Sequence, residues 1–321
     1  MSVWLITGGA GYIGSHVVRE LQAAGVQPVV FDNFSAGLHS RIPQGVPVVD
    51  ADVSDGDALR VALRECEVTG VIHLAAKKAA GESVGIPLYY YQENVTGLQS
   101  VLGAMVDLGI KNFVYSSSAA VYGTPQSNPV KESEPLNPES PYGETKVIGE
   151  WLAKDLETSY GLNWVALRYF NVAGSGAKEL GDNSVNNLIP MVFSALEKGV
   201  KPKIFGADYP TPDGTCIRDY IHVMDLAGAH VAAVKKCEAG LVNQAINVGR
   251  GSGVSVREVM NSISAVLGRD IAPEVAPRRA GDPPATFADV ELSKDKLDWI
   301  AKRDLTDMVS SAWSAWEFSH R

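Results

Sequence analysis

The chain has 321 residues, more than the usual ~100 to 200 of a single domain, so we expect two lobes or one large α/β unit with an appended part. Hydrophobic residues make up 45% and charged residues 20%, as in globular proteins, which argues against a disordered, fibrous or membrane protein. The formal charge of -9 argues against a nucleic-acid-binding protein, which normally carries a basic surface.

The three cysteines, Cys66, Cys216 and Cys237, are far apart and form neither a disulfide framework nor a metal-ligand spacing. We therefore expect no metal site and a reducing, cytoplasmic location. The N-terminus runs directly into a strand pattern, and no apolar run of about 20 residues is present, so we expect neither secretion nor membrane insertion.

The first predicted unit is a strand, a tight turn and a helix. Residues 3–7 form a short apolar run, Gly8, Gly11 and Gly14 follow, and a helical pattern covers residues 15–24. Glycines at this spacing let the backbone approach a pyrophosphate at the helix N-terminus. A second strand over 29–31 ends in Asp32, 18 residues beyond Gly14, where an acid can bond ribose hydroxyls and repel a 2′-phosphate. The sequence therefore predicts NAD in preference to NADP.

Strands and helices continue to alternate, which predicts a parallel, doubly wound sheet. We expect strands over 46–49, 70–74 and 112–115, and helices over 57–66 and about 89–108. His73 ends an apolar strand and is interpreted as a packed structural histidine rather than a base. Because ligands of such sheets lie at the carboxyl ends of the strands, we expect the following residues to line the cofactor site: Asn33, Asp52, Val53, Leu74, Ala75, Ala76, Lys77 and Lys78.

The candidate catalytic residues follow the strand over 112–115. Three serines, 116 to 118, come directly after it, and Ser140-Pro141 is a good helix opening. Tyr142 and Lys146 lie four residues apart on one face of that helix, so an ammonium lies beside a phenol that otherwise loses its proton only near pH ~10. With Ser118 to hydrogen-bond a substrate oxygen, the three side chains suit proton transfer beside a nicotinamide.

These motifs, in this order, resemble those of the extended short-chain dehydrogenase/reductases, and over nearly the whole chain those of the UDP-glucose 4-epimerase family. The blocks that carry the resemblance are Gly8 to His16, Ala80 to Val84, Ser116 to Gly123, Arg168 to Asn171, Phe205 to Thr211 and Arg218 to Val223. The resemblance implies NAD and these further cofactor contacts: Tyr12, Ile13, Asn94, Ser116, Tyr169 and Phe170. For Asn94, this role requires that its helix faces the cleft.

The resemblance also implies a UDP-sugar substrate. An arginine can give paired donors to phosphate oxygens, and asparagines and backbone amides can read the uracil edges. Besides Ser118 and Tyr142, the implied substrate contacts are Lys78, Ala120, Phe170, Asn171, Asn187, Leu188, Lys203, Ile204, Phe205, Arg218, Arg279, Asp282 and Thr286.

The regular pattern stops after Asn171, and proline and glycine are frequent from 174 to 214. We therefore predict a Rossmann-like NAD-binding domain over 1–171 and a smaller mixed α/β substrate lobe over 172–321. The resemblance implies that this lobe is discontinuous, because about 219–248 returns to the first domain as a helix and the strand 244–248. It also implies a homodimer through helices near 92–108 and 145–160. A helix over 305–318 has the spacing of a core-packing element.

The implied activity is C4 epimerisation of UDP-sugars, interconverting UDP-glucose and UDP-galactose through a 4-keto intermediate. Ala119 and Ala120 stand where sugar-nucleotide dehydratases of similar layout carry acids, which favours epimerisation over loss of water. Some family members have Tyr where this chain has Thr286, beside the C2 substituent of the sugar, so the smaller residue predicts room for an N-acetyl group. Two alternatives stay open: an epimerase or reductase for a nucleotide pentose or uronic acid, and a non-catalytic NAD-binding sensor.

Overall fold

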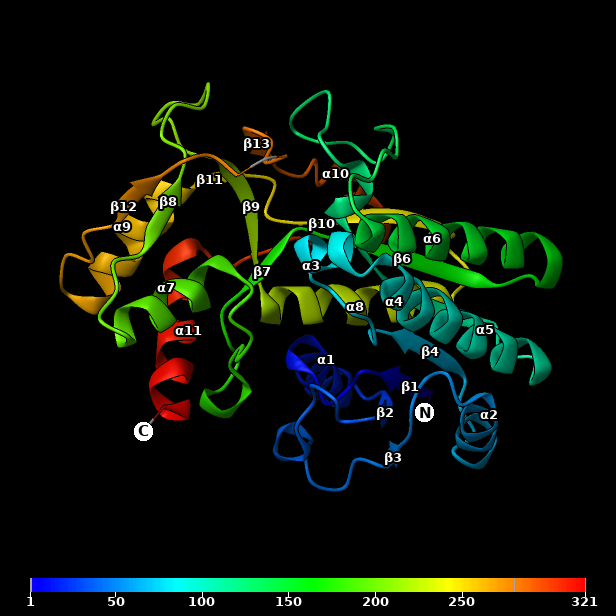
Figure 1. Ribbon diagram of the computed structural model, residues 1–321. Coiled ribbons are helices and arrows are strands. Elements are labelled where there is room, and N and C mark those ends of the chain that lie inside the picture. Colours follow the sequence, from blue (N-terminus) through cyan, green and yellow to red (C-terminus); the bar gives the residue numbers. More distant parts are fainter. Residues whose placement is uncertain (1, 280, 321) are drawn as a thin grey trace.

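The computed structural model describes residues 2–279 and 281–320, so Ala280, between the predicted substrate contacts Arg279 and Asp282, lies outside the described residues. At its centre is a seven-stranded parallel sheet in the order β10-β6-β5-β4-β1-β2-β3 (Figure 1). The α/β class and the doubly wound parallel sheet predicted from the sequence are confirmed. The strands are β1 (Val3–Thr7), β2 (Gln27–Asp32), β3 (Val48–Asp50), β4 (Gly70–His73), β5 (Asn112–Ser118), β6 (Asn163–Tyr169) and β10 (Gln244–Val248).

Helices cover both faces of this sheet. Helices α1 (Tyr12–Ala23) and α8 (Val223–Glu238) pack on one face. Helices α2 (Gly56–Glu65), α5 (Gly97–Asp107) and α6 (Pro141–Tyr160) pack on the other. Successive side chains of a strand point to opposite faces, so Trp4 and Ile6 of β1 join the first cluster and Leu5 joins the second. Burial on both faces explains why the strands read as continuous apolar runs.

The helix predicted over 89–108 is divided into three parts. After the short α3 (Ala80–Gly85), the chain forms α4 (Pro87–Tyr91), a π-helical turn (Gln92–Thr96) and then α5. The π-helical turn holds Asn94 inward, where its Oδ1 accepts from the Lys77 amide at 2.8 Å and its Nδ2 donates to Thr145 Oγ1 at 3.0 Å. Such a turn has no signature in a hydrophobic pattern of period 3.6, so the sequence could not predict it.

A second, smaller body of structure follows β7. Strand β9 (Ile217–His222) pairs with β7 (Asn171–Ala173), β11 (Gly253–Ser255) and β13 (Ala285–Thr286), and β8 (Lys203–Phe205) pairs with β12 (Glu274–Ala276). Helices α7 (Leu188–Glu197), α9 (Val256–Leu267) and α11 (Leu305–Ser319) enclose a separate core that contains Phe193, Met308 and Trp316. Figure 1 shows these helices on the side of the molecule opposite α2 and α5. The predicted C-terminal helix is thus present and packs in a core.

The segment expected to return to the first sheet over 219–248 does so only from Val223. Residues 219–222 belong instead to β9, because their backbone pairs with β7 and β11. Helix α8 then packs beside α1, and β10 pairs in parallel with β6. The short α10 (Glu291–Leu297) packs against α8. Within the described ranges, no helix is both long and apolar enough to cross a membrane.

Candidate active site

A cavity of about 620 Å³ lies at the carboxyl ends of the central strands. It opens where the chain leaves the neighbouring strands β1 and β4 in opposite directions, which is the usual ligand site of a doubly wound sheet. Most of the predicted cofactor residues line it, namely Gly8, Gly11, Tyr12, Ile13, Gly14, Asp32, Asn33, Asp52, Val53, Leu74, Ala75, Ala76, Lys77, Lys78, Ser116, Tyr142, Lys146 and Tyr169.

The glycine turn at this cavity requires glycine for steric reasons. Gly8 has a positive φ of 71°, and a Cβ there would lie 2.8 Å from the Ala75 nitrogen. A Cβ at Gly14 would lie 2.2 Å from the Gly8 carbonyl oxygen. The close turn brings the N-terminus of α1 to the cavity, where its free amides favour an anion.

Asp32 stands at the end of β2, beside the glycine turn. Its Oδ2 accepts from the Ala10 amide at 2.9 Å, and its Oδ1 accepts from the Phe34 amide at 2.9 Å. The carboxylate is therefore fixed at the cavity wall, where it can accept hydrogen bonds from ribose hydroxyls. Together with the glycine turn, these residues fit a dinucleotide with a free 2′-hydroxyl.

Helix α6 brings Tyr142 and Lys146 to the same cavity. Ser140 caps it, with its side chain accepting from the Gly143 amide at 3.2 Å, and Pro141 is its first residue. The Lys146 ammonium donates to Ser116 O at 2.6 Å and to Ser116 Oγ at 3.2 Å, and it lies 5.8 Å from the centre of the Tyr142 ring. The predicted helix start and the shared face are both present.

The electrostatics of this pair disfavour a phenolate in the protein alone. Burial raises the pKa of the Tyr142 phenol, and the Ser118 hydroxyl beside it acts in the opposite direction. Burial lowers the pKa of the Lys146 ammonium to about 7, although attraction to Glu150 opposes that effect. A further positive charge in the cavity would favour loss of the Tyr142 proton, and the resulting phenolate could then act as a base at neutral pH.

A buried ionic network holds α6 against β5 and β6. Glu150 Oε1 accepts from Ser117 Oγ at 2.5 Å and from Arg168 Nε at 2.9 Å, while Glu150 Oε2 pairs with Arg168 Nη2 at 2.6 Å. Arg168 also donates to the Tyr122 hydroxyl at 2.8 Å. Glu150 lies four residues after Lys146 on α6, so the network fixes the helix face that carries the candidate base.

Several predicted residues lie close to the larger cavity without lining it. Ser118 belongs to β5, not to a loop after it, and its hydroxyl accepts from the Ala120 amide at 3.1 Å at the start of the 3-10 turn Ala119–Tyr122. Ala120 and Phe170 are likewise not part of the lining. Asn94 stands behind the wall and supports Lys77. His73 is buried against Thr7 with a pKa lowered by burial to about 3, as expected of a structural histidine.

A second cavity of about 200 Å³ adjoins the first, because Asn186 lines both. Arg279 stacks on the Phe205 ring at 3.9 Å, and Arg218 pairs with Asp282 at 3.4 Å. The predicted substrate residues in its lining are Asn171, Asn187, Leu188, Lys203, Phe205, Arg218, Arg279 and Asp282. The predicted residues Ile204 and Thr286 line neither cavity, because Ile204 is buried in the core around α7 and Thr286 is buried in β13.

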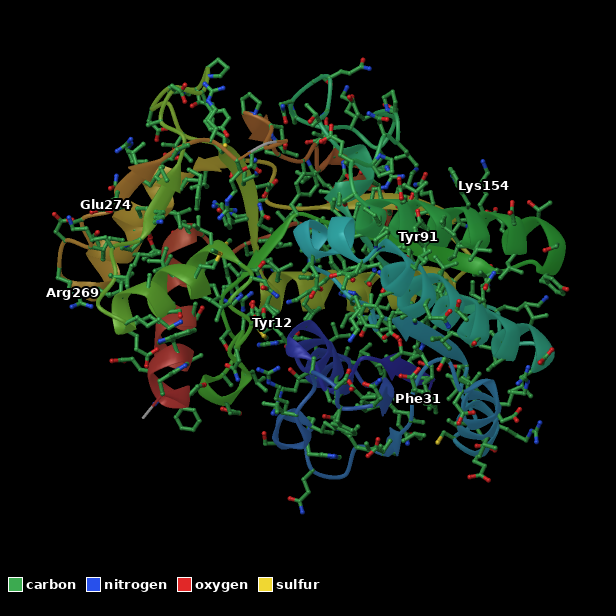
Figure 2. All side chains as sticks on the ribbon, viewed as in Figure 1. Tyr12, Phe31, Tyr91, Lys154, Arg269 and Glu274 are labelled. Atoms are coloured by element: carbon green, nitrogen blue, oxygen red, sulfur yellow. The ribbon has the colours of Figure 1, made fainter. Side chains whose placement is uncertain are left out.

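The residues missed by the sequence interpretation come mainly from two irregular segments. One follows β2 and ends in a 3-10 turn (His39–Arg41), and the other covers residues 182–186. Tyr12, labelled in Figure 2, lies at the start of α1 and joins the two halves by donating to Gly174 O at 2.6 Å. The largely polar run over 182–187 could have indicated cavity-lining residues from the sequence alone, whereas no sequence pattern marks Arg41 as one. The missed lining residues of the larger cavity are Phe31, Ser35, Ala36, Gly37, Leu38, Arg41, Ala51, Ala79, Glu82, Tyr90, Glu93, Ser117, Asp182, Asn183, Ser184 and Asn186.

Comparisons with known proteins agree with this geometry. The model of the NAD dependent epimerase/dehydratase family matches residues 4–249. The UDP-glucose 4-epimerase of Bacillus subtilis (strain 168) is 43% identical over 329 aligned positions, which cover 98% of this chain and 97% of that protein.

Solved structures of such epimerases are also similar to this chain. The crystal structure of UDP-glucose 4-epimerase from Brucella ovis in complex with NAD has a TM-score of 0.94 and 42% identity, covering 99% of this chain and 98% of that one. The UDP-glucose 4-epimerase from Bifidobacterium longum, in complex with NAD+ and UDP, has a TM-score of 0.90 and 34% identity over 98% of each chain.

Proposed function

The chain belongs to the NAD-dependent epimerase/dehydratase family, and on this basis we propose that it interconverts UDP-glucose and UDP-galactose by inverting C4 of the sugar. The observation that carries the proposal is the position of Tyr142 and Lys146, which line one cavity together with the glycine turn and Asp32. The full-length identity to UDP-glucose 4-epimerases supports the substrate and the reaction.

The proposed cofactor is NAD, held in the larger cavity by the glycine turn and Asp32. When bound, it supplies a carbon that accepts a hydride from C4 of the sugar and returns it. A carboxylate at Asp32 would repel a 2′-phosphate, so NADP is the poorer ligand. The hydrogen bonds of the Asp32 carboxylate to two backbone amides support this preference for NAD, because they hold its negative charge at the cavity wall.

The chain's own residues move the proton and hold the substrate. In this proposal, Tyr142 takes the proton of the C4 hydroxyl, Lys146 stabilises the phenolate, and Ser118 hydrogen-bonds the C4 oxygen. The resulting 4-keto sugar turns within the site, receives the hydride on its other face, and regains its proton from Tyr142. Arg218 and Arg279 hold the UDP part in the smaller cavity during that rotation, which keeps the reactive ketone bound.

The sugar specificity is a separate proposal. Thr286 lies beside Arg218 in the β9–β13 pair, and its buried hydroxyl has no hydrogen-bond partner among the described residues. A small side chain next to a residue of the UDP cavity supports acceptance of an N-acetyl group at C2, as in UDP-N-acetylglucosamine and UDP-N-acetylgalactosamine. Nucleotide pentoses and uronic acids are the alternative substrates.

Assembly, domain division and location also stay proposals. We expect a homodimer through α5 and α6, and the exposure of Trp151 on α6, at 58%, supports an apolar contact there. The division near residue 172 into an NAD-binding domain and a substrate lobe is supported by the separate core around α7, α9 and α11. A cytoplasmic location rests on the sequence.

The direct test is to incubate the purified protein with UDP-galactose and no added NAD. We expect UDP-glucose to form until the two sugars reach equilibrium, because NAD stays bound and is regenerated in each cycle. NAD released on denaturation should approach one molecule per chain. Formation of a 4-keto or dehydrated product in place of UDP-glucose would contradict the proposed reaction, and absence of any product would favour the sensor.

A further inference from the structure

Arg41 is a buried cation at the larger cavity to which no motif assigns a role. It ends the 3-10 turn His39–Arg41 after β2, and its exposed fraction is 3%. Arg41 lines the cavity together with Gly11 and Tyr12 at the N-terminus of α1. Its Nη2 donates to Gly181 O at 2.6 Å, which connects the first half of the chain to the segment over 181–187.

Among the described residues, no carboxylate forms an ion pair with the Arg41 guanidinium. Within residues 2–279 and 281–320, Arg41 forms no ion pair, its Nε has no hydrogen-bond partner, and Nη2 to Gly181 is the one hydrogen bond that the guanidinium donates. The acid that acts on it electrostatically is Asp182. That carboxylate is already engaged, because Oδ1 accepts from Ser184 and Oδ2 accepts from Asn187 at 2.7 Å.

This environment is unfavourable for a positive charge. Burial lowers the pKa of the Arg41 guanidinium, with Asp182 and Tyr12 acting in the opposite direction, yet arginine stays protonated in proteins. A buried charge without a partner destabilises the folded state, so an anion that enters the cavity would gain from pairing with it. The planar fork of donors is suited to a phosphate group.

A second feature of the cavity independently favours an anion. Helix α1 begins at Tyr12 with no acidic residue in its first turn, so the positive end of its dipole meets no negative side chain of its own. The glycine turn presents the same helix end to the cavity that Arg41 lines. Two sources of positive potential from different elements therefore act on the same cavity.

We propose that Arg41 binds a phosphate oxygen of the diphosphate of the dinucleotide, as a contact additional to the glycine turn. This inference rests on the proposed function, since it takes NAD as the ligand. Because the same guanidinium holds Gly181, the contact also links the bound diphosphate to the 181–187 segment of the second half. The other phosphate that could reach a cation at this cavity is the 2′-phosphate of NADP, which the Asp32 carboxylate disfavours.

The test compares Arg41→Gln with wild type, using protein depleted of NAD on charcoal. Arg60→Gln is the control, since Arg60 lies on α2 outside the cavity and pairs with Asp57 and Asp107. Affinities for NAD, NADP, ADP and adenosine are measured by calorimetry. Loss of a charge-assisted contact should weaken NAD and ADP about 10- to 100-fold and leave adenosine within about twofold. The control should leave all four affinities unchanged.

Four results would overturn the inference, and the last of them would also reject the proposed function. Unchanged NAD and ADP affinities in Arg41→Gln would remove the contact, and weakening of NADP alone would assign it to a 2′-phosphate. Equal weakening of ADP and adenosine binding in Arg41→Gln would show that Arg41 acts structurally, through its hydrogen bond to Gly181. In that case Arg41→Lys, which keeps the charge, should weaken both ligands to the same extent. A wild type that binds no NAD would instead reject the proposed function, and this inference with it.

Discussion

At the scale of single residues, the account depends on how one cavity changes the chemistry of a phenol and an ammonium. Burial raises the pKa of Tyr142 and lowers the pKa of Lys146 to about 7. The two side chains by themselves therefore do not favour the reactive pair, which is a Tyr142 phenolate beside a Lys146 ammonium. A cationic cofactor ring would stabilise the phenolate. Proton transfer would then depend on prior binding of the cofactor, which limits the reactive base to the loaded enzyme.

Replacement of Tyr142 by Phe tests the base directly. The ring and its packing remain and only the hydroxyl is lost, so turnover of UDP-galactose should fall by at least about 100-fold. The bound NAD and the circular dichroism spectrum should be unchanged. Tyr160→Phe is the matched control, because Tyr160 is exposed at the other end of α6. Turnover within tenfold of wild type in Tyr142→Phe would reject the assignment.

Replacement of Thr286 by Tyr tests the sugar specificity. A larger side chain in β13, beside Arg218, should reduce the space at C2 and lower the turnover of UDP-N-acetylglucosamine more than tenfold. Turnover of UDP-glucose serves as the folding control, because a hydroxyl at C2 needs less room. Equal turnover of the acetylated sugar in wild type and variant would show that Thr286 does not set the specificity.

At the scale of elements, the glycine turn is the point where sterics decide the fold of the site. In Gly14→Ala, the new Cβ would lie 2.2 Å from Gly8 O, so the turn must move and stability should fall by about 1–3 kcal/mol or more. Retained NAD should fall as well. Gly103→Ala in α5 is the control: apart from the neighbouring residues and backbone of its own helix, no described atom lies within 4 Å of the position of the new Cβ, so it should stabilise the protein by about 0.4–1 kcal/mol. Equal melting temperatures of the two variants would contradict this explanation.

The sequence predicted elements best where one local pattern decides them. Strand 244–248 and the start of α6 at Ser140 follow from an apolar run and from a capping residue, and both lie where expected. The π-helical turn at Asn94, the continuation of β5 to Ser118 and the strand over 219–222 depend on partners distant in sequence. Arg41 belongs with the latter, because burial against Gly181 is what makes its charge significant.

At the scale of the whole molecule, four buried histidines make the fold sensitive to acid. Burial is the largest cause that lowers the pKa of His73 to about 3 and the pKa values of His16, His222 and His230 to about 4. Between about pH 6.5 and 4 the unfolded chain binds protons that the folded chain does not. Stability is therefore fully present above pH 6.5 and is lost as the pH falls, by about 1.4 kcal/mol per pH unit for each histidine.

Urea unfolding at several pH values measures this dependence. The midpoint should fall steadily from pH 7 to pH 5, and His230→Gln should reduce the slope by about one proton. A midpoint independent of pH over that range would show that these histidines are charged or exposed in the folded protein.

The central claim for the whole molecule is inversion of C4 through removal and return of one hydride. UDP-galactose carrying deuterium at C4 is incubated with the purified protein in ordinary water, and the UDP-glucose formed is analysed by mass spectrometry and NMR. Because the hydride is held in the site and returned to the same carbon, deuterium should be retained at C4 of the product. Replacement of that deuterium by solvent hydrogen would contradict the proposed mechanism.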